Sequence, residues 1–306
     1  MNRATIRIGH TVLPGARRPQ VLRGAALVAA LLFCSASLVK AHDFWLIPDA
    51  FAVTPGGRLA VNGQTSSLFP TSLSAATPDR IVKARVFTAD SSVPVRDISV
   101  VGASLRMSHP TTQAGQRVVS VQLAPRSVRE SPASFLRYLD LEGAPEARVR
   151  YDKEGLLPRA GGDSITRRYA KYAKTVVEVG RGPRAFQRVV GHPLEFVPLT
   201  DPASLRTGDT LRVRLLLLGK PAAFARFHAG SVGTNHQAAQ RDTTAARSAA
   251  ADDVAVETDG NGVATVVIVR PGVWNVRTLQ IVPAARKSGA DWDVHWATLV
   301  FAVSPR

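Results

Sequence analysis

Short segments in which apolar and polar residues alternate limit the fold of this chain more than any other feature of its sequence. The alternation is clear in residues 82–86, 119–123 and 211–215, where a polar or charged residue separates successive apolar ones. Such a period of two gives a strand one buried face and one solvent-exposed face, as in antiparallel sheets and sandwiches. The sequence therefore predicts a mainly β protein.

Glycine and proline mark the turns between further strands in the C-terminal half. Residues 259–262 (Asp-Gly-Asn-Gly) can adopt the positive φ angles of a tight hairpin, here one that joins two strands within residues 254–269. About seven short strands with regular turns predict an immunoglobulin- or transthyretin-like antiparallel β-sandwich. The other strands expected in this half lie at residues 194–199, 210–218, 274–281 and 296–303.

Helix signals are few. Ser131 and Pro132 are typical of an N-cap and a first-turn residue, and Gly143 is typical of a helix stop. A second short helix is expected at residues 164–174, leading directly into a strand at residues 175–179. The fold should therefore contain one or two short helices beside its strands.

The first 41 residues have the composition of a secretory signal peptide. They contain six basic residues and no acidic one, and an apolar run at residues 25–39 precedes Lys40. A basic leader, a short apolar stretch and small residues before a break predict cleavage after Ala41 and export to the periplasm. The apolar run is shorter than the roughly 20 residues of a spanning helix, so no integral membrane span is expected after cleavage.

Two other forms of export stay open. Arg17 and Arg18 before the apolar run are compatible with a twin-arginine route instead of the general secretory route. Cys34 suggests a lipoprotein, although Phe33 is bulky for the residue before a lipidated cysteine. Cys34 is the only cysteine, so cleavage after Ala41 would leave a mature chain without disulfides or thiolate chemistry.

The length of the mature chain predicts two domains. About 265 residues remain after cleavage, which is more than most single cores hold. Glycine and proline interrupt the strand pattern at residues 180–191, so we expect sandwich domains at residues 42–185 and 190–306. The second of these contains a long polar segment, residues 231–253, of the kind that is either functional or mobile.

The basic charge of the mature chain has no accompanying recognition motif. Removing the six basic residues of the leader from the 39 in the sequence leaves 33, against 23 acidic residues, for a net charge of +10. No aromatic platform or recognition helix accompanies the arginines, so nucleic acid is not an expected partner. The sequence also lacks a GxSxG elbow and a phosphate-binding GxxxxGK[ST] loop, so a hydrolase is not indicated.

Several stretches together resemble one bacterial protein family. They are AHDFWLIP at the expected mature start, KYAKTVVEVG in the middle, TDGNG and PGVW in the C-terminal half, and DWDVHWATLVFAV near the end. The family consists of exported proteins with a domain of unknown function, commonly labelled as periplasmic components of nickel and cobalt uptake systems. Residues 219–278 also resemble the regulatory sandwich domains attached to carboxypeptidases.

This resemblance implies a periplasmic β-sandwich protein that handles a divalent metal beside a membrane transporter. The chain departs from the family pattern on the strand after Pro271 and Gly272. Where family members carry a histidine, this chain has the triplet Leu279, Gln280 and Ile281. One expected metal ligand is therefore missing.

His42 is the first candidate ligand that the residues themselves suggest. As the first residue after cleavage it would offer an α-amine and an imidazole, which together can chelate one metal ion. Nitrogen ligands of this kind suit nickel, cobalt or copper. The alternative is that His42 only begins the first strand.

His295 lies in a segment whose residue pattern predicts a strand. In a strand, Asp293 and His295 share one face while Trp292, Val294 and Trp296 occupy the other. A carboxylate and an imidazole on one face could join His42 as ligands. The alternative is a polar face that only covers a tryptophan-rich core.

Two further histidines complete the candidate set. His192 precedes Pro193 at the expected domain boundary, where Glu195 could orient its ring, and His228 ends a strand. Each histidine alone is more often a surface or turn residue than a ligand, and no local zinc signature such as HExxH occurs. The candidate metal ligands are therefore His42, His295, Asp293, His228 and His192.

These observations lead to three functional hypotheses. The first is a non-enzymatic periplasmic accessory protein that binds nickel, cobalt or copper for an uptake transporter. The second is a metal-independent interaction module that binds a protein or a glycan. The third is a copper oxidoreductase with an N-terminal histidine brace, which requires a second histidine near His42.

Overall fold

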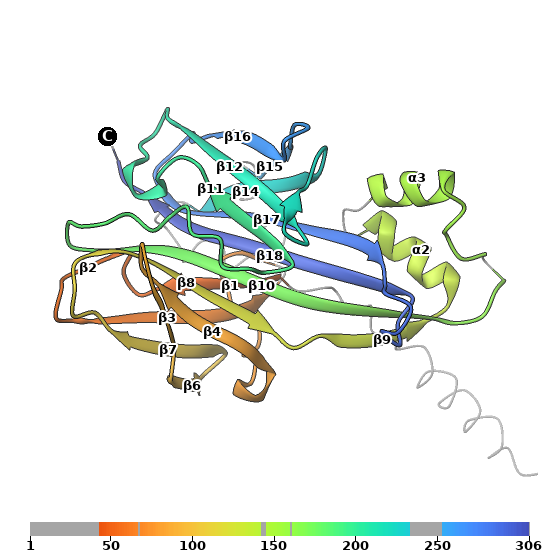
Figure 1. Cartoon of the computed structure of the whole chain (residues 1–306), viewed down its shortest axis with the longest axis horizontal. Helices are drawn as coiled ribbons and strands as arrows, with labels where there is room; N and C mark the ends of the chain where they lie inside the picture. Colours follow the sequence, from red (N-terminus) through yellow and green to blue (C-terminus); the bar gives the residue numbers. More distant parts are fainter. Residues whose placement is uncertain (1–42, 67, 142–144, 160, 233–252, 306) are drawn as a thin grey trace, which may run out of the picture. The chain divides into compact units, whose positions relative to one another are not determined.

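The computed structural model describes residues 43–66, 68–141, 145–159, 161–232 and 253–305 (Figure 1). The expected signal peptide, His42 and most of the polar segment 231–253 lie outside the described residues. The described residues from Asp43 onward belong to one compact unit. The unit consists mainly of strands in several sheets, which confirms the predicted fold class.

The first sheet is built entirely from the N-terminal half. Each pair of neighbours in it is antiparallel. The N-terminal strand of the described chain forms one edge of this sheet, so Asp43 lies at a sheet edge. In spatial order the strands are β1 (Asp43–Pro48), β3 (Arg58–Ser66), β7 (Ser104–Pro110) and β6 (Asp97–Val101).

The second sheet has ten strands, and both halves of the chain contribute to it. The pairs β10–β18 and β10–β2 are parallel and the others are antiparallel. Its main path runs through β15 (Val254–Glu257), β14 (Arg226–Val232), β17 (Gly272–Pro283), β18 (Trp292–Val303), β10 (Ile165–Val179), β8 (Gly115–Leu123), β4 (Ile81–Phe87) and β5 (Ser92–Pro94). Two short strands, β2 (Ala52–Val53) and β9 (Arg126–Glu130), also pair with β10.

The third sheet comes from the C-terminal half. Along β12, Leu211, Val213 and Leu215 are buried while Arg212 and Arg214 are exposed, as the alternating pattern predicts. Its strands are β11 (Leu194–Pro198), β12 (Thr210–Leu217), β13 (Lys220–Pro221) and β16 (Val263–Val267). The short 3-10 turns η1 (Pro78–Arg80) and η2 (Pro202–Ser204) lie in connections between strands.

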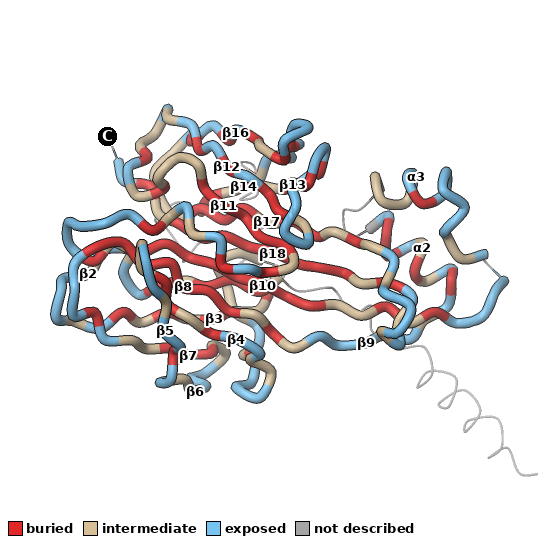
Figure 2. Tube along the Cα trace, viewed as in Figure 1, coloured by how far each residue is buried: buried red, intermediate tan, exposed pale blue. Residues whose placement is uncertain are grey.

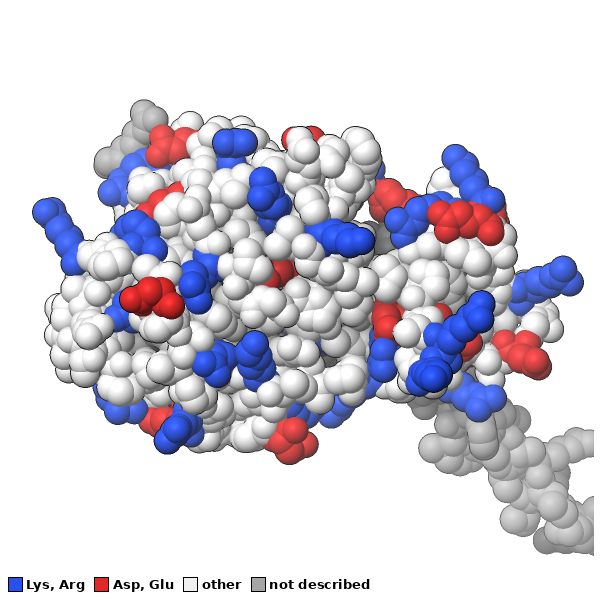
Figure 3. All heavy atoms as spheres, viewed as in Figure 1, with Lys and Arg blue, Asp and Glu red and all other residues white. Residues whose placement is uncertain are grey.

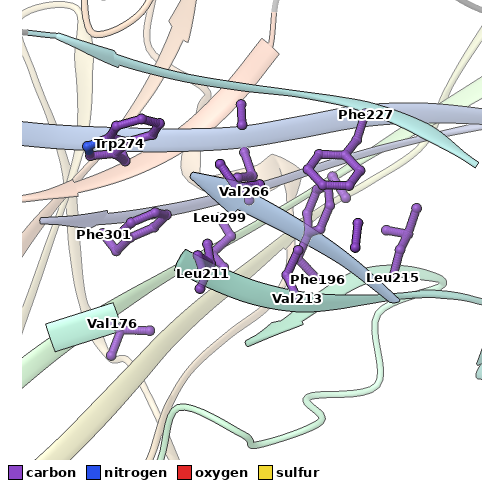
Figure 4. Packing of buried hydrophobic residues seen from close by; sticks show 14 of the residues in the cluster. Val176, Phe196, Leu211, Val213, Leu215, Phe227, Val266, Trp274, Leu299 and Phe301 are labelled. Carbon is purple, nitrogen blue, oxygen red and sulfur yellow. The ribbon is translucent and has the colours of Figure 1, made fainter. Parts of the chain in front are cut away.

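Of the three hydrophobic cores in the described part of the chain, two join the ten-stranded sheet to another sheet. One joins it to the first sheet and the other joins it to the third (Figure 2). In the second core, Trp274 stacks on Phe301 at 6.4 Å and Phe196 meets Phe227 edge-on at 5.3 Å (Figure 4). The predicted boundary between residues 185 and 190 falls in the β10–β11 connection, but β10 serves both cores. The division into two domains stays a prediction.

Strand β10 corrects the prediction of a helix at residues 164–174. All of Ile165–Val179 is one strand. Tyr172 and Val176 pack into the core beside the third sheet, whereas Ala173 and Val177 pack into the core beside the first. A strand buried on both faces has no solvent-exposed side, so it lacks the alternation of apolar and polar residues that identifies half-exposed strands. Backbone pairing with β18 on one side and β8 and β9 on the other overrides the local helical preference.

Strand β8 is also buried on both faces. The sequence pattern predicts a wet face containing Ser120, but Ser120 is 1% exposed. Both neighbours of β8, β4 and β10, belong to the ten-stranded sheet, and Val118 and Val119 enter different cores. The prediction of a solvent-exposed face for this strand is therefore wrong.

The turn at residues 259–262 also differs from its prediction. Strands β15 and β16 on either side of it belong to different sheets, so they form no hairpin. The Asp259 carboxylate accepts the N–H groups of Asn261 (2.8 Å) and Val263 (2.9 Å), and Gly262 has a φ of 70°. These residues do form a tight turn, but the turn connects strands of two different sheets.

Two helices cover one end of the ten-stranded sheet. They are α2 (Pro132–Leu141), which confirms the predicted capped helix, and α3 (Pro145–Lys153), which was not predicted. Trp292 of β18 lies between them, 5.2 Å from the Phe135 ring and 4.9 Å from the Tyr151 ring. Neither described helix is long and apolar enough to cross a membrane.

The Ser131 hydroxyl caps α2 by accepting the Ser134 N–H at 3.2 Å. We expect Ser131→Ala to lower the free energy of unfolding by about 1 kcal/mol, because one first-turn N–H loses its acceptor. Ser131→Asp should retain the stability, since aspartate is an equally good cap. Urea unfolding measures both, with Ser99→Ala on an exposed strand position as the control. Equal stabilities for the two alanine variants would contradict the role of the cap.

Candidate functional site

Strand β1 brings Asp43, the residue after the predicted mature N-terminus, to the ten-stranded sheet. The Thr298 hydroxyl of β18 donates to the Phe44 carbonyl at 2.7 Å, which attaches the strand. The Asp43 carboxylate lies 3.5 Å from Nε of Arg277 on β17. The start of the described chain therefore faces a guanidinium on the neighbouring sheet.

Arg277 links Asp43 to the end of the polar segment. Its Nη1 donates to Oδ1 of Asp253 at 3.1 Å, and its Nη2 donates to Oδ2. His228 of β14 is the direct cross-strand partner of Arg277. We refer to Asp43, His228, Asp253 and Arg277 as the N-terminal cluster.

His228 is the imidazole of this cluster. Its side chain is 42% exposed, and its Nδ1 lies 3.6 Å from Oδ2 of Asp253. The Nδ1 atom itself is buried and has no hydrogen-bond partner in the described part of the chain. Burial lowers the pKa of His228, and Arg277 adds to this while Asp253 opposes it. The ring is therefore neutral at pH 7 and carries a nitrogen lone pair.

His295 and Asp293 share one face of β18, as the strand pattern predicts, but each is already paired. Arg168 donates to both carboxylate oxygens of Asp293, at 2.7 and 2.9 Å. Nδ1 of His295 lies 3.0 Å from the Tyr172 hydroxyl, and the two rings stack at 5.9 Å. Burial lowers the pKa of His295. On the opposite face of the strand, Trp292, Val294 and Trp296 pack into the core beneath α2 and α3.

His192 contacts the same tyrosine. Its ring centroid is 5.3 Å from that of Tyr172, and the residue is 4% exposed. Its Nε2 has no hydrogen-bond partner among the described residues. Burial lowers the pKa of His192 to about 3, and the charges of Lys174 and Lys83 add to this effect. Tyr172 thus brings two of the predicted histidines into one buried stack.

A buried ion pair lies beside this stack. Nζ of Lys174 is 2.7 Å from Oε1 of Glu195, and both side chains are 1% exposed. Glu195 also accepts the backbone N–H groups of Val190, Gly191 and His192. Glu195 therefore orients the backbone at His192, whereas the sequence suggested an interaction with the ring. Lys174 fell within the predicted helix, so its role was missed.

The predicted ligands thus lie in different surroundings. His228 belongs to the N-terminal cluster, His192 and His295 each contact Tyr172, and Asp293 is paired with Arg168. His42 lies outside the described residues. Within those residues, no group of three or more histidine, cysteine, aspartate or glutamate side chains is placed to hold a metal ion.

The sequence matches a known protein family. The model of a domain of unknown function, DUF4198, matches residues 39–281. The chain belongs to this family. The DUF4198 match includes the whole N-terminal cluster and ends before Asp293 and His295. The carboxypeptidase-like resemblance and the nickel and cobalt label stay predictions, and no curated protein matches the chain.

Solved structures resemble the chain only distantly. A trypsin-activated α2-macroglobulin of Escherichia coli aligns with 86% of this chain and 16% of its own length, at 11% identity and a TM-score of 0.22. Mouse nectin-like molecule 4 aligns with 87% of this chain and 65% of its own, at 12% identity and a TM-score of 0.18. The TIE protein of Bacillus anthracis aligns with 93% and 45%, at 10% identity and a TM-score of 0.21. The chain spans about a sixth of the first of these proteins.

Proposed function

We propose that this protein is a non-enzymatic accessory protein of the periplasm that binds a divalent transition metal at its mature N-terminus and presents it to an uptake transporter. The observation that supports this proposal is the series of contacts from Asp43 through Arg277 and Asp253 to His228. After cleavage at Ala41, His42 would be the residue joined directly to Asp43.

The donor atoms of the cluster favour a metal that prefers nitrogen. Arg277 lies against both carboxylates, so their oxygens are already engaged. The remaining donors would be the α-amine and imidazole of His42 and the buried Nδ1 of His228. Such a set suits nickel, cobalt or copper, whereas magnesium and calcium prefer oxygen ligands. Because His228 is neutral at pH 7, it would bind without releasing a proton.

Calorimetric titration with nickel, cobalt and copper salts tests the proposal on protein that begins at His42. We expect a single ion per chain, bound at least about tenfold more weakly by His228→Ala and by protein carrying one additional N-terminal residue, since either change removes a donor. His295→Ala should leave the affinity unchanged because His295 is held in the buried stack with Tyr172.

His109→Ala is the matched control, because His109 is a partly buried histidine of β7 outside the cluster. Binding no tighter than that of a His42→Ala variant would contradict metal binding. A folded protein that binds none of the three metals would instead support the metal-independent interaction module.

A further inference from the structure

A pocket of about 560 Å³ opens between α3, the connection around Phe224 and the outer end of β17. In Figure 3 the surface is hollowed between the helices and the sandwich. None of the residues of the N-terminal cluster lines it. Its volume lies within the roughly 300–1,000 Å³ typical of small-molecule sites in proteins.

Regular secondary structure forms the walls of this pocket. Beyond Arg277, β17 has no register partner on β14, so Leu279, Gln280 and Ile281 lie on an edge of the sheet. The Tyr151 hydroxyl of α3 donates to the Ile281 carbonyl at 2.7 Å and attaches the helix to that edge. The helix therefore stands as the opposite wall of a pocket whose floor is a strand.

The charged side chains around the pocket are mainly cationic. Arg150, Lys220 and Arg226 line it, and Glu146 is the one acidic residue among the described residues that do so. Nη1 of Arg226 lies 2.7 Å from Oε1 of Glu146, without the alignment of a hydrogen bond. Lys220 has no side-chain ion pair within the described part of the chain, and the Arg150 guanidinium stacks on Tyr151 at 4.4 Å. Two positive charges are thus left for a ligand.

The apolar lining includes a strained and exposed aromatic side chain. Phe224 is 68% exposed, and its φ of 53° lies in the left-handed region that a bulky residue rarely adopts. Strain of this kind persists where the surrounding structure holds it, and it concentrates at ligand sites. The half-buried Leu217 also lines the pocket, and the buried Leu279 and Ile281 lie at its floor. A ligand that covered the Phe224 ring would remove it from water.

We propose that this pocket binds a small organic monoanion whose charge lies near Arg150 and Lys220 and whose apolar body packs on Phe224. The walls favour a ligand with both parts. A neutral hydrocarbon would leave the cations without a counter-ion, and an inorganic ion would leave the Phe224 ring exposed to water. This site is separate from the metal proposal and does not depend on it.

Fluorescence titration with two matched probes tests the proposal on the mature protein. 8-Anilinonaphthalene-1-sulfonate carries a sulfonate on an aromatic body, and N-phenyl-1-naphthylamine has the same body without the charge. Changing both Arg150 and Lys220 to Gln should weaken sulfonate binding about tenfold, as expected for two partly screened charges, and leave the neutral probe within about twofold. Phe224→Ala should weaken both probes about tenfold.

Matched variants separate the pocket from the general surface. Arg212→Gln removes an exposed arginine, and Leu73→Ala removes an exposed apolar residue, both away from the pocket. Neither should change either affinity. Equal effects of pocket and control variants, or a sulfonate probe insensitive to Arg150 and Lys220, would overturn the proposal. Circular dichroism verifies that each variant is folded.

A competition experiment identifies the source of the anion. Monomeric decanoate should displace the sulfonate probe, whereas decanol should not, because only the former has a carboxylate. Displacement by phosphatidylglycerol vesicles but not by decanoate would overturn a small-molecule site in favour of a lipid surface.

Discussion

Lys174→Met is expected to lower the free energy of unfolding by about 3–5 kcal/mol, the usual cost of removing one partner from a buried ion pair. Glu195, 2.7 Å away and 1% exposed, would be left as an uncompensated charge in the core. The carbonyl of Phe196 would also lose the 2.9 Å hydrogen bond that Lys174 donates. Chemical denaturation at pH 7 measures the loss.

Changing Glu195 to Gln in the same protein should recover part of the lost stability. Glutamine carries no charge, and its carbonyl oxygen can still accept a backbone N–H group near His192. Arg212→Met, on the exposed face of β12, is the control and should change the stability by less than about 0.5 kcal/mol. A loss below about 1 kcal/mol for Lys174→Met would mean that Glu195 takes up a proton or reaches water.

Lowering the pH from 7 to 5 is expected to cost the protein about 2 kcal/mol of stability through His192 alone. The folded-state pKa of His192 is lowered to about 3, while the unfolded chain has the ordinary value of 6.5. Between these two values the unfolded state binds a proton that the folded state does not. Stability is therefore lost as the pH falls through 6.5, and the loss continues until about pH 3.

His192→Gln and His192→Leu should each remove this contribution, because neither side chain titrates. Urea unfolding at pH 7 and pH 5 compares the variants with the parent protein. His109→Gln is the control: burial also lowers the pKa of His109, but its ring is more exposed, so its contribution should be smaller. An unchanged pH dependence in both His192 variants would show that this imidazole takes up a proton in the folded state.

The sequence by itself determined the elements whose signals are local. Strand β12 was predicted because its leucines and valines alternate with arginines and only one of its faces is buried. Helix α2 was predicted because Ser131 and Pro132 are typical of a helix start and Gly143 of a helix stop, and the Ser131 hydroxyl does cap the helix. In each case the residues that decide the structure lie within a few positions of one another, so their spacing carries the information.

Only the tertiary structure decided the elements that the two cores share. Strand β10 is buried on both faces, and its strand partners include residues 125 positions away, such as Val300, whose carbonyl accepts a hydrogen bond from Thr175. The strands on either side of the 259–262 turn pair with strands that lie 25 to 57 positions away instead of with each other, so a hairpin sequence joins two sheets.

The candidate residues divide in the same way. The sequence identified His192, His228 and His295 by type, and it identified Asp293 and His295 as neighbours on one strand face. It contained no signal that Tyr172 would contact both His192 and His295, that Lys174 would meet Glu195, or that Arg277 would connect Asp43 with Asp253. These contacts join separate strands, and their positions depend on how the sheets pack, which no short stretch of the chain encodes.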